Sequence, residues 1–302
     1  NINNVLSNSF NFRLGLSATP ERYMDPHGTR LIKEYFGIIL EPVYSLKDSL
    51  DNGILAQYNY HPIIVDLIKD EEGSYRNISN QIQKIWDTAE NKEDWFKKAE
   101  SFIKKRNIIL NTASQKLVKL REMLIKIGKD SIQNALIYCY GMDHLEKIAK
   151  ILFDLDISNA RITAREKMND RFDSFKLFKN NDRQVLLAIN CLDEGLDIPA
   201  ISLGFVLASS SNPKQFIQRR GRLLRKIRTK DGNIIEKNVN IYDFISFPPL
   251  GSKGVLPKYE EDLFNKEIAR FKEFAELANN RNEALNIIND YMIKIGKVKI
   301  KI

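Results

Sequence analysis

The chain has 302 residues, of which 43% are hydrophobic and 28% are charged, enough for one large domain or two moderate ones. This composition excludes a disordered chain, and the lack of an apolar run of about 18 residues excludes a membrane span. Lysine and arginine number 47 against 39 for aspartate and glutamate, a net charge of +8. That excess favours a polyanionic partner, although a solvated basic surface explains it equally well.

The two cysteines, Cys139 and Cys191, lie inside or beside apolar runs and lack the spacing of a metal site or a redox pair. We therefore expect buried reduced thiols, no metal site on this chain, and a reducing compartment, the cytoplasm. No signal peptide opens the chain. Because the first residue is Asn1 rather than Met, we expect a processed or partial chain.

The first predicted element is a short strand at residues 12–16, which runs directly into Ser17-Ala18-Thr19-Pro20. Parallel strands need neighbouring strands and crossover helices, and the sequence offers none close by. Residues 1–56 are therefore expected to be the last piece of a domain whose earlier strands are missing.

Residues 72–107 predict a pair of amphipathic helices, because apolar residues recur there at helical spacing. Basic residues stand between the apolar ones, at Lys97, Lys98, Lys104, Lys105 and Arg106. Two interpretations remain open. The basic side chains form a solvated outer face, or they belong to a helical insertion that contacts nucleic-acid phosphates.

Residues 108–247 alternate between helical and strand-like patterns. The predicted strands are 135–139, 160–163, 185–189, 201–207 and 239–244, and the predicted helices are 110–127, 142–153, one carrying Phe172 and one beginning at Asn212-Pro213. Strands that are apolar on both faces, joined by helices, predict a parallel sheet with helices on both faces. A helical stretch over 257–295 follows and is expected to pack against this sheet.

The loop that follows strand 185–189 is the first candidate site. Such loops leave the carboxyl edge of a parallel sheet, where α/β proteins place ligands. Gly195 permits close backbone approach, and Asp197 stands shortly before Pro199, which favours an extended chain.

The second candidate site is the basic run 215–225, which contains Gln218, Arg222 and Arg225. The two arginines stand three residues apart, so on a helix they would project from one face. Fixed guanidinium groups are suited to the charge that develops during phosphoryl transfer, where an arginine finger contributes about 10³–10⁵ in rate.

Taken together, segments 15–22, 185–199 and 215–225 resemble, in order and spacing, motifs III, V and VI of the superfamily 2 helicases. Residues 135–139 resemble motif IV. The resemblance implies nucleotide contacts by Gly195, Asp197 and Gln218, arginine fingers at Arg222 and Arg225, interlobe coupling by Ser17, Ala18 and Thr19, and nucleic-acid backbone contacts by Thr163 and Asn190.

The resemblance also implies an α/β fold, with a RecA-like parallel sheet, a helical insertion and a helical C-terminal extension. Its expected divisions are the C-terminal remnant of a first RecA-like lobe at residues 1–56, a second lobe at 57–250 with an insertion at about 72–130, and an extension at 251–302. Glu194 and Gln218 stand where RNA-remodelling relatives usually have Arg and His, which favours the DNA repair and restriction branch. Ile189 replaces a frequent backbone-contacting Thr, a role that Asn190 would have to take over.

The phosphate-binding Gly-x-x-x-x-Gly-Lys-Ser/Thr loop and the Asp-Glu magnesium motif of such enzymes do not occur in the sequence. We therefore expect the second motor lobe of an ATP-dependent DNA helicase or translocase, with ATP and Mg²⁺ bound mainly by a missing first lobe. The chain alone is expected to be inactive. Two alternatives remain, a non-catalytic nucleic-acid-binding or regulatory module and a fragment of an RNA helicase.

Overall fold

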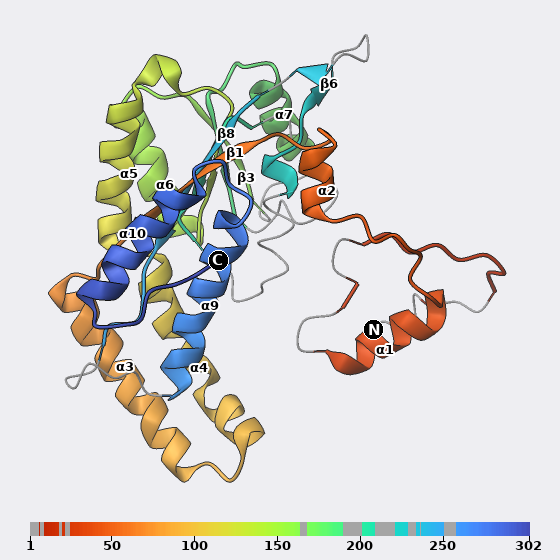
Figure 1. The fold of residues 1–302 in the computed structure, drawn as a ribbon. Coiled ribbons are helices and arrows are strands. Elements are labelled where there is room, and N and C mark those ends of the chain that lie inside the picture. The colour runs from red at the N-terminus through yellow and green to blue at the C-terminus, as the bar shows by residue number, and fades with distance from the viewer. Residues whose placement is uncertain are drawn as a thin grey trace.

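A parallel β-sheet forms the centre of the molecule in the computed structural model, which describes residues 6, 9–17, 20–21, 25–163, 168–189, 201–208, 221–228, 234–235, 237–250 and 258–302 (Figure 1). In this part of the chain the sheet has six strands in the order β1-β8-β5-β2-β4-β3, and every neighbouring pair is parallel. The strands are β1 (Tyr58–Ile64), β2 (Ala135–Tyr138), β3 (Asn159–Ile162), β4 (Val185–Ala188), β5 (Leu203–Val206) and β8 (Val239–Ile245). A short antiparallel pair, β6 (Ile227–Arg228) and β7 (Ile234–Ile235), lies outside it.

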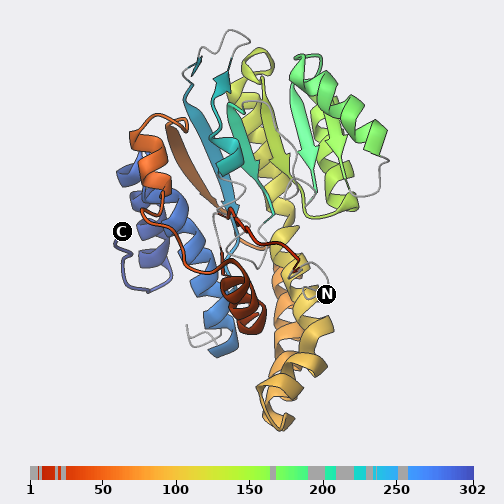
Figure 2. The same ribbon diagram turned by 90° about the vertical axis from the view of Figure 1, so that its right-hand side faces the viewer.

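Helices cover both faces of the sheet, which confirms the predicted α/β architecture (Figure 2). Side chains of α5 (Ser114–Ile127) and α6 (Met142–Asp154) pack on one face. Side chains of α7 (Met168–Lys179), α9 (Lys258–Ala275) and α10 (Arg281–Lys294) pack on the other. The central strands β2, β4 and β5 are buried at every residue, because each is apolar on both faces.

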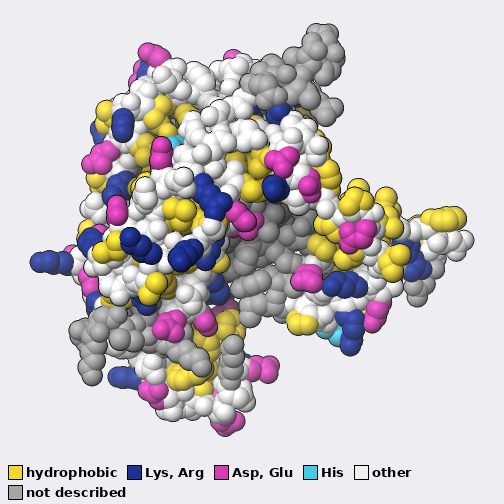
Figure 3. All heavy atoms as spheres, in the orientation of Figure 1, with side chains coloured by type: hydrophobic (Ala, Val, Ile, Leu, Met, Phe, Trp, Pro, Cys, Tyr) yellow, Lys and Arg dark blue, Asp and Glu magenta, His cyan; other side chains and the backbone are white. Residues whose placement is uncertain are grey.

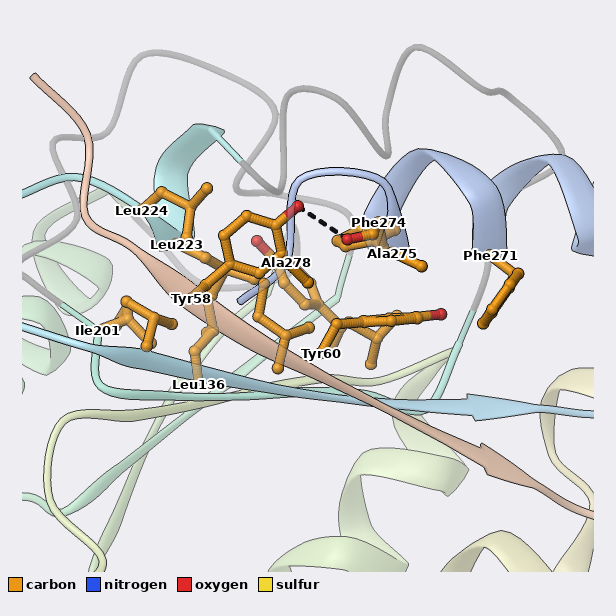
Figure 4. Packing of buried hydrophobic residues seen from close by; sticks show 14 of the residues in the cluster. Tyr58, Tyr60, Leu136, Ile201, Leu223, Leu224, Phe271, Phe274, Ala275 and Ala278 are labelled. Carbon is orange, nitrogen blue, oxygen red and sulfur yellow. Dashed lines mark hydrogen bonds between the residues drawn. The ribbon is translucent and has the colours of Figure 1, made fainter. Parts of the chain in front are cut away.

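Strand β1 is an element that the sequence patterns did not reveal. It contains Pro62 and two polar residues, yet it pairs with β8 along its whole length at the edge of the sheet. Its aromatic residues Tyr58 and Tyr60 are fully buried against Phe271 and Phe274 of α9, and the Tyr58 hydroxyl donates a 2.8 Å hydrogen bond to the Phe274 carbonyl (Figure 4).

The outer edge of β1 is covered rather than open. The Asn279 N–H donates to the Tyr58 carbonyl at 2.9 Å. The side chain of Asn280 accepts from the Tyr60 N–H at 2.7 Å and donates to the Tyr60 carbonyl at 3.0 Å. These bonds use backbone groups that would otherwise be available to pair with another strand.

The predicted helix over 110–127 is interrupted in the structure. Helix α4 (Lys92–Asn111) ends at Asn111, and α5 begins at Ser114. Thr112 and Ala113 between them are not helical. The Glu71 carboxylate accepts a 2.8 Å hydrogen bond from the Ser114 N–H, which satisfies one of the free amides at the start of α5.

Helices α3 (Lys69–Thr88) and α4 form a hairpin that extends beyond the sheet, whereas α5 packs on the sheet itself (Figures 1 and 2). The hairpin has a small core of its own at Ile82, Trp95 and Ala99. Most of its basic residues already have acidic or aromatic neighbours. Lys98 pairs with Asp94, Lys104 with Glu100, Lys105 lies over Phe102, and Arg106 is buried beside Glu260 of α9. This pairing favours the interpretation of the hairpin as a solvated structural element.

The N-terminal segment differs from the rest of the molecule. Residues 12–16 were predicted to form a strand, but in the described part of the chain they belong to no sheet, because no described strand lies beside them to bond their backbone. The segment packs instead on α1 (Pro26–Phe36), where the Arg13 guanidinium lies 4.2 Å from the centre of the Tyr35 ring. Figure 3 shows hydrophobic side chains gathered on this part of the surface, and Phe12 and Leu16 are 96% and 89% exposed.

Candidate functional site

The candidate residues are divided between the two ends of the parallel strands. We call the end where the strands begin the amino edge and the end where they finish the carboxyl edge. Residues 55–57, 201–202 and 237–238 lie at the amino edge, directly before β1, β5 and β8. Thr163 and Ile189 lie at the carboxyl edge, directly after β3 and β4.

Arg222 and Arg225 lie at the amino edge, but not on one face of a helix as their spacing predicted. The helical turns end at Leu223, and Arg225 continues in an extended bridge with Leu55. The Ala56 N–H donates a 2.7 Å hydrogen bond to the Leu224 carbonyl beside this bridge. Pairing with the chain before β1 competes with a further helical turn, and the spacing rule fails for that reason.

The two arginines differ in exposure. The side chain of Arg225 is exposed, whereas Arg222 is half-buried, and Leu223 and Leu224 between them are fully buried in the sheet core. Two apolar anchors thus fix the backbone that carries two cationic side chains.

At the carboxyl edge, the Ile189 N–H donates to the Ile162 carbonyl at 3.3 Å, so the ends of β3 and β4 are held side by side. Thr163 follows immediately and is buried. The predicted nucleic-acid contact at Thr163 therefore lies at the opposite end of the sheet from Arg222 and Arg225.

A cluster of buried polar side chains supports the carboxyl edge, and the sequence patterns did not identify it. Lys116 of α5 is 2% exposed and donates a 2.8 Å hydrogen bond to the Leu207 carbonyl, just after β5. Burial lowers the pKa of Lys116 to about 7. His144 of α6 accepts a 3.3 Å hydrogen bond from the Tyr140 N–H at Nδ1, and burial lowers its pKa to about 4.

The same cluster contains a buried ionic group on β8 and α9. The Arg270 guanidinium lies 3.1 Å from the Asp243 carboxylate and 2.7 Å from the Glu267 carboxylate. The Tyr60 hydroxyl donates a 2.8 Å hydrogen bond to Asp243. Burial and the neighbouring Asp243 carboxylate raise the pKa of Tyr60, so it remains a neutral donor. A single arginine in an apolar helical stripe was the only signal in the sequence.

Several candidate residues lie outside the described part of the chain: Ala18, Thr19, Asn190, Cys191, Gly195, Asp197 and Gln218. Ser17 lies on the exposed N-terminal segment. Cys139 is a buried thiol directly after β2, and its Sγ–H donates to the Ile137 carbonyl. Among the described residues, no group of three or more His, Cys, Asp or Glu side chains is placed to hold a metal ion, and no helix is long and apolar enough to cross a membrane.

Arg222 and Arg225 place two guanidinium groups, a type of group that binds phosphate oxygens bidentately, at the amino edge. The strand order also has a reversal between β2 and β5, since the connection after β2 leads toward β3 and the one after β5 leads toward β8. In open α/β sheets such a reversal marks a ligand-binding crevice at the carboxyl ends of the strands. Here that is the edge that carries Thr163, not the edge that carries Arg222 and Arg225. The fold is thus an open parallel α/β sheet with a topological reversal between β2 and β5.

Comparison with known proteins identifies the lobe further. Residues 115–226 match the family described as the helicase conserved C-terminal domain. The chain is 25% identical over 244 residues to the DNA 3′-5′ translocase XPB2 of Sulfurisphaera tokodaii, which covers 74% of this chain and 52% of that protein. It is 25% identical over 274 residues to putative helicase 22 of Sulfolobus islandicus filamentous virus, which covers 90% of this chain and 42% of that protein.

A third relative, the ATP-dependent rRNA helicase spb4 of Aspergillus fumigatus, is 30% identical over 120 residues, which covers 39% of this chain and 19% of that protein. Residues 115–226 are thus similar to a helicase C-terminal domain, and these curated relatives are named as helicases or a translocase. It spans about half the length of the first two curated relatives.

Proposed function

We propose that the chain is the second motor lobe of an ATP-dependent superfamily 2 DNA helicase or translocase. In this proposal the amino edge of the sheet receives the nucleotide and the carboxyl edge receives the nucleic-acid backbone. Residues 1–56 are the remnant of the first lobe, residues 57–250 are the second lobe, and residues 251–302 are its helical extension.

The observation that carries the proposal is the pairing of Arg225 with Leu55. This bridge joins the arginine segment to the stretch that enters the lobe from the N-terminal segment. A change in the position of a first lobe would therefore be transmitted through Leu55 and Ala56 to the backbone that bears the arginines. Such a connection is what a motor needs if nucleotide binding is to be coupled to domain closure.

At the nucleotide, we assign Arg222 and Arg225 as the groups that offset the developing phosphate charge. Gly195, Asp197 and Gln218 are proposed to contact the ribose and phosphates, and Ser17, Ala18 and Thr19 to couple the nucleotide state to closure. ATP and Mg²⁺ would be bound mainly by the first lobe. Bound ATP supplies the phosphoryl group, while this chain supplies positive charge that is fixed by its buried neighbours Leu223 and Leu224.

At the carboxyl edge, the ends of β3 and β4 with Thr163 and Asn190 are proposed to contact the sugar-phosphate backbone with little reading of bases. DNA is the proposed polymer. The translocase similarity supports this choice, while the similarity to an rRNA helicase supports RNA as the second candidate.

The test is nucleic-acid-stimulated ATP hydrolysis by the full-length protein that carries this chain. The Arg225→Ala variant is expected to lower kcat by about 10³-fold or more, as loss of an arginine finger does. The isolated chain is expected to show no stimulated hydrolysis. Measuring the rate with single-stranded DNA and with RNA of the same sequence decides between the two polymers.

Arg121→Ala is the matched control, because Arg121 lies on the outer face of α5 in an exposed ion pair with Asp154. It should retain wild-type kcat. Stimulated hydrolysis by the isolated chain, or an Arg225→Ala protein as active as the Arg121→Ala protein, would contradict the proposal.

A further inference from the structure

Lys237 connects two parts of the amino edge that are distant in sequence. Its ammonium group donates hydrogen bonds to the Ile201 carbonyl at 2.5 Å and to the Leu223 carbonyl at 3.2 Å. Ile201 stands directly before β5, and Leu223 is the residue between the two candidate arginines that follows Arg222. One side chain thus ties the entry of β5 to the end of the arginine segment.

The arginine segment has a second support on β5 itself. Gly204 has no side chain, and a Cβ atom there would lie 3.1 Å from both terminal methyl carbons of Leu223. Leu223 therefore sits closer to the strand than any other residue at position 204 would allow without movement. The third support is the Ala56 N–H, which binds the Leu224 carbonyl at 2.7 Å.

We propose that Lys237 is a positioning residue for the arginine pair, which holds the backbone of Leu223 so that Arg222 and Arg225 face the nucleotide. The proposal rests on the function proposed above. Lys237 does not itself touch the phosphates in this assignment. It acts through the two carbonyl groups that it joins.

The chemistry of the site supports a role beyond filling space. A lysine in a partly buried position loses hydration, and burial lowers the pKa of Lys237 to about 7. An apolar residue would avoid that loss, but it would leave the carbonyls of Ile201 and Leu223 without this donor. Only a long donor side chain joins both carbonyls. Lys237 thus fixes the positions of the two carbonyl groups, although burying its charge costs stability.

The experiment compares Lys237→Met and Lys237→Arg with wild type in the full-length protein, at saturating nucleic acid. Lys237→Met should lower kcat for ATP hydrolysis by about 10- to 100-fold, because small displacements of catalytic groups have effects of this size. Its affinity for nucleic acid without nucleotide should be unchanged, since the carboxyl edge is not altered. Lys237→Arg retains a donor and should recover most of kcat.

Gly204→Ala tests the same support without changing a charge. The added methyl group pushes on the Leu223 side chain, so this variant should also lower kcat. If Lys237→Met fails to fold, the proposal is still tested by Gly204→Ala, which should lower kcat, and by Lys237→Arg, which should retain most of it.

Lys116→Met is the matched control, because Lys116 is also a buried lysine that binds one backbone carbonyl beside β5, but at the carboxyl edge. An equal loss of kcat in Lys116→Met and Lys237→Met would show general destabilisation and overturn the proposal. Wild-type kcat in Lys237→Met, with Arg225→Ala inactive, would overturn it while leaving the proposed function intact. Wild-type kcat in Arg225→Ala would instead contradict the proposed function.

Discussion

The sheet lobe and the N-terminal segment contain similar apolar patterns, but these are buried in the lobe and exposed in the segment. Leu187 in β4 is fully buried, whereas Leu16 in the N-terminal segment is 89% exposed. Burying a leucine side chain contributes about 1.5–3 kcal/mol, so the lobe gains this stabilisation many times over and the segment gains almost none. The comparison teaches that an apolar run forms a strand only when neighbouring strands are present to pair with it.

The largest expected effect concerns the buried ionic group of the lobe. Arg270→Met leaves the Asp243 and Glu267 carboxylates buried without their cation, and it should lower the free energy of unfolding by about 3–5 kcal/mol. The N-terminal segment offers the matched control, Arg30→Met, because Arg30 pairs with Glu34 in an exposed position. That variant should change stability by less than about 0.5 kcal/mol. Denaturant unfolding of both variants measures the difference. Equal free energies of unfolding would contradict the view that the ion pairs of the lobe are buried and those of the N-terminal segment are exposed.

The next effect compares the two leucines directly. Leu187→Ala should cost about 2–5 kcal/mol, since it removes buried methyl groups and leaves a cavity between α5, α6 and the sheet. Leu16→Ala should be close to neutral in thermal unfolding. A clear loss of stability in Leu16→Ala would mean that the N-terminal segment is buried in solution.

The smallest effect is the dependence of stability on pH. The pKa of Lys116 is lowered from 10.5 to about 7, so between these values the unfolded chain binds more protons than the folded chain. The free energy of unfolding therefore rises with pH in this window, with a slope of roughly 1 kcal/mol per pH unit. His144, with a pKa lowered from 6.5 to about 4, gives a rise of the same sign at lower pH.

Denaturant unfolding at pH 7.5, 8.5 and 9.5 measures the slope. Lys116→Met should unfold with a flatter pH dependence than wild type, because the titrating group is absent. Lys294→Met serves as control, since Lys294 is exposed in its pair with Asp66. Identical slopes for wild type and Lys116→Met would place Lys116 in contact with solvent.

Much of the fold could be predicted from the sequence because its central strands are short apolar runs. Runs 135–139 and 185–189 are apolar without interruption, and 201–207 is interrupted only by Ser202 and Gly204; β2, β4 and β5 lie within these runs. The helices on both sides of β3, α6 and α7, were predicted from the spacing of their apolar residues. Strand β1 was missed because Pro62 and alternating polar residues weaken its pattern, and only its pairing with β8 reveals it.

The candidate site was predicted by residue type but not by arrangement. Arg222 and Arg225 were identified from their motif, yet the prediction that both project from one face of a helix was wrong, because Arg225 leaves the helix and pairs with Leu55. Lys237 and Lys116 carry no local signal at all. Their importance depends on carbonyl groups that lie 14 and 91 residues away in sequence, at Leu223 and Leu207.

The sequence by itself determined the alternation of helix and strand, the parallel sheet and the motifs of the motor class, because these depend on local periodicity and short-range spacing. Only the tertiary structure decided that Arg222 and Arg225 lie at the opposite edge from Thr163, that β1 joins the sheet, and that two lysines bind carbonyl groups at the two ends of β5. These features depend on which backbone groups are left to be paired once the sheet has formed, and a hydrogen bond between distant residues leaves no periodic trace in the chain.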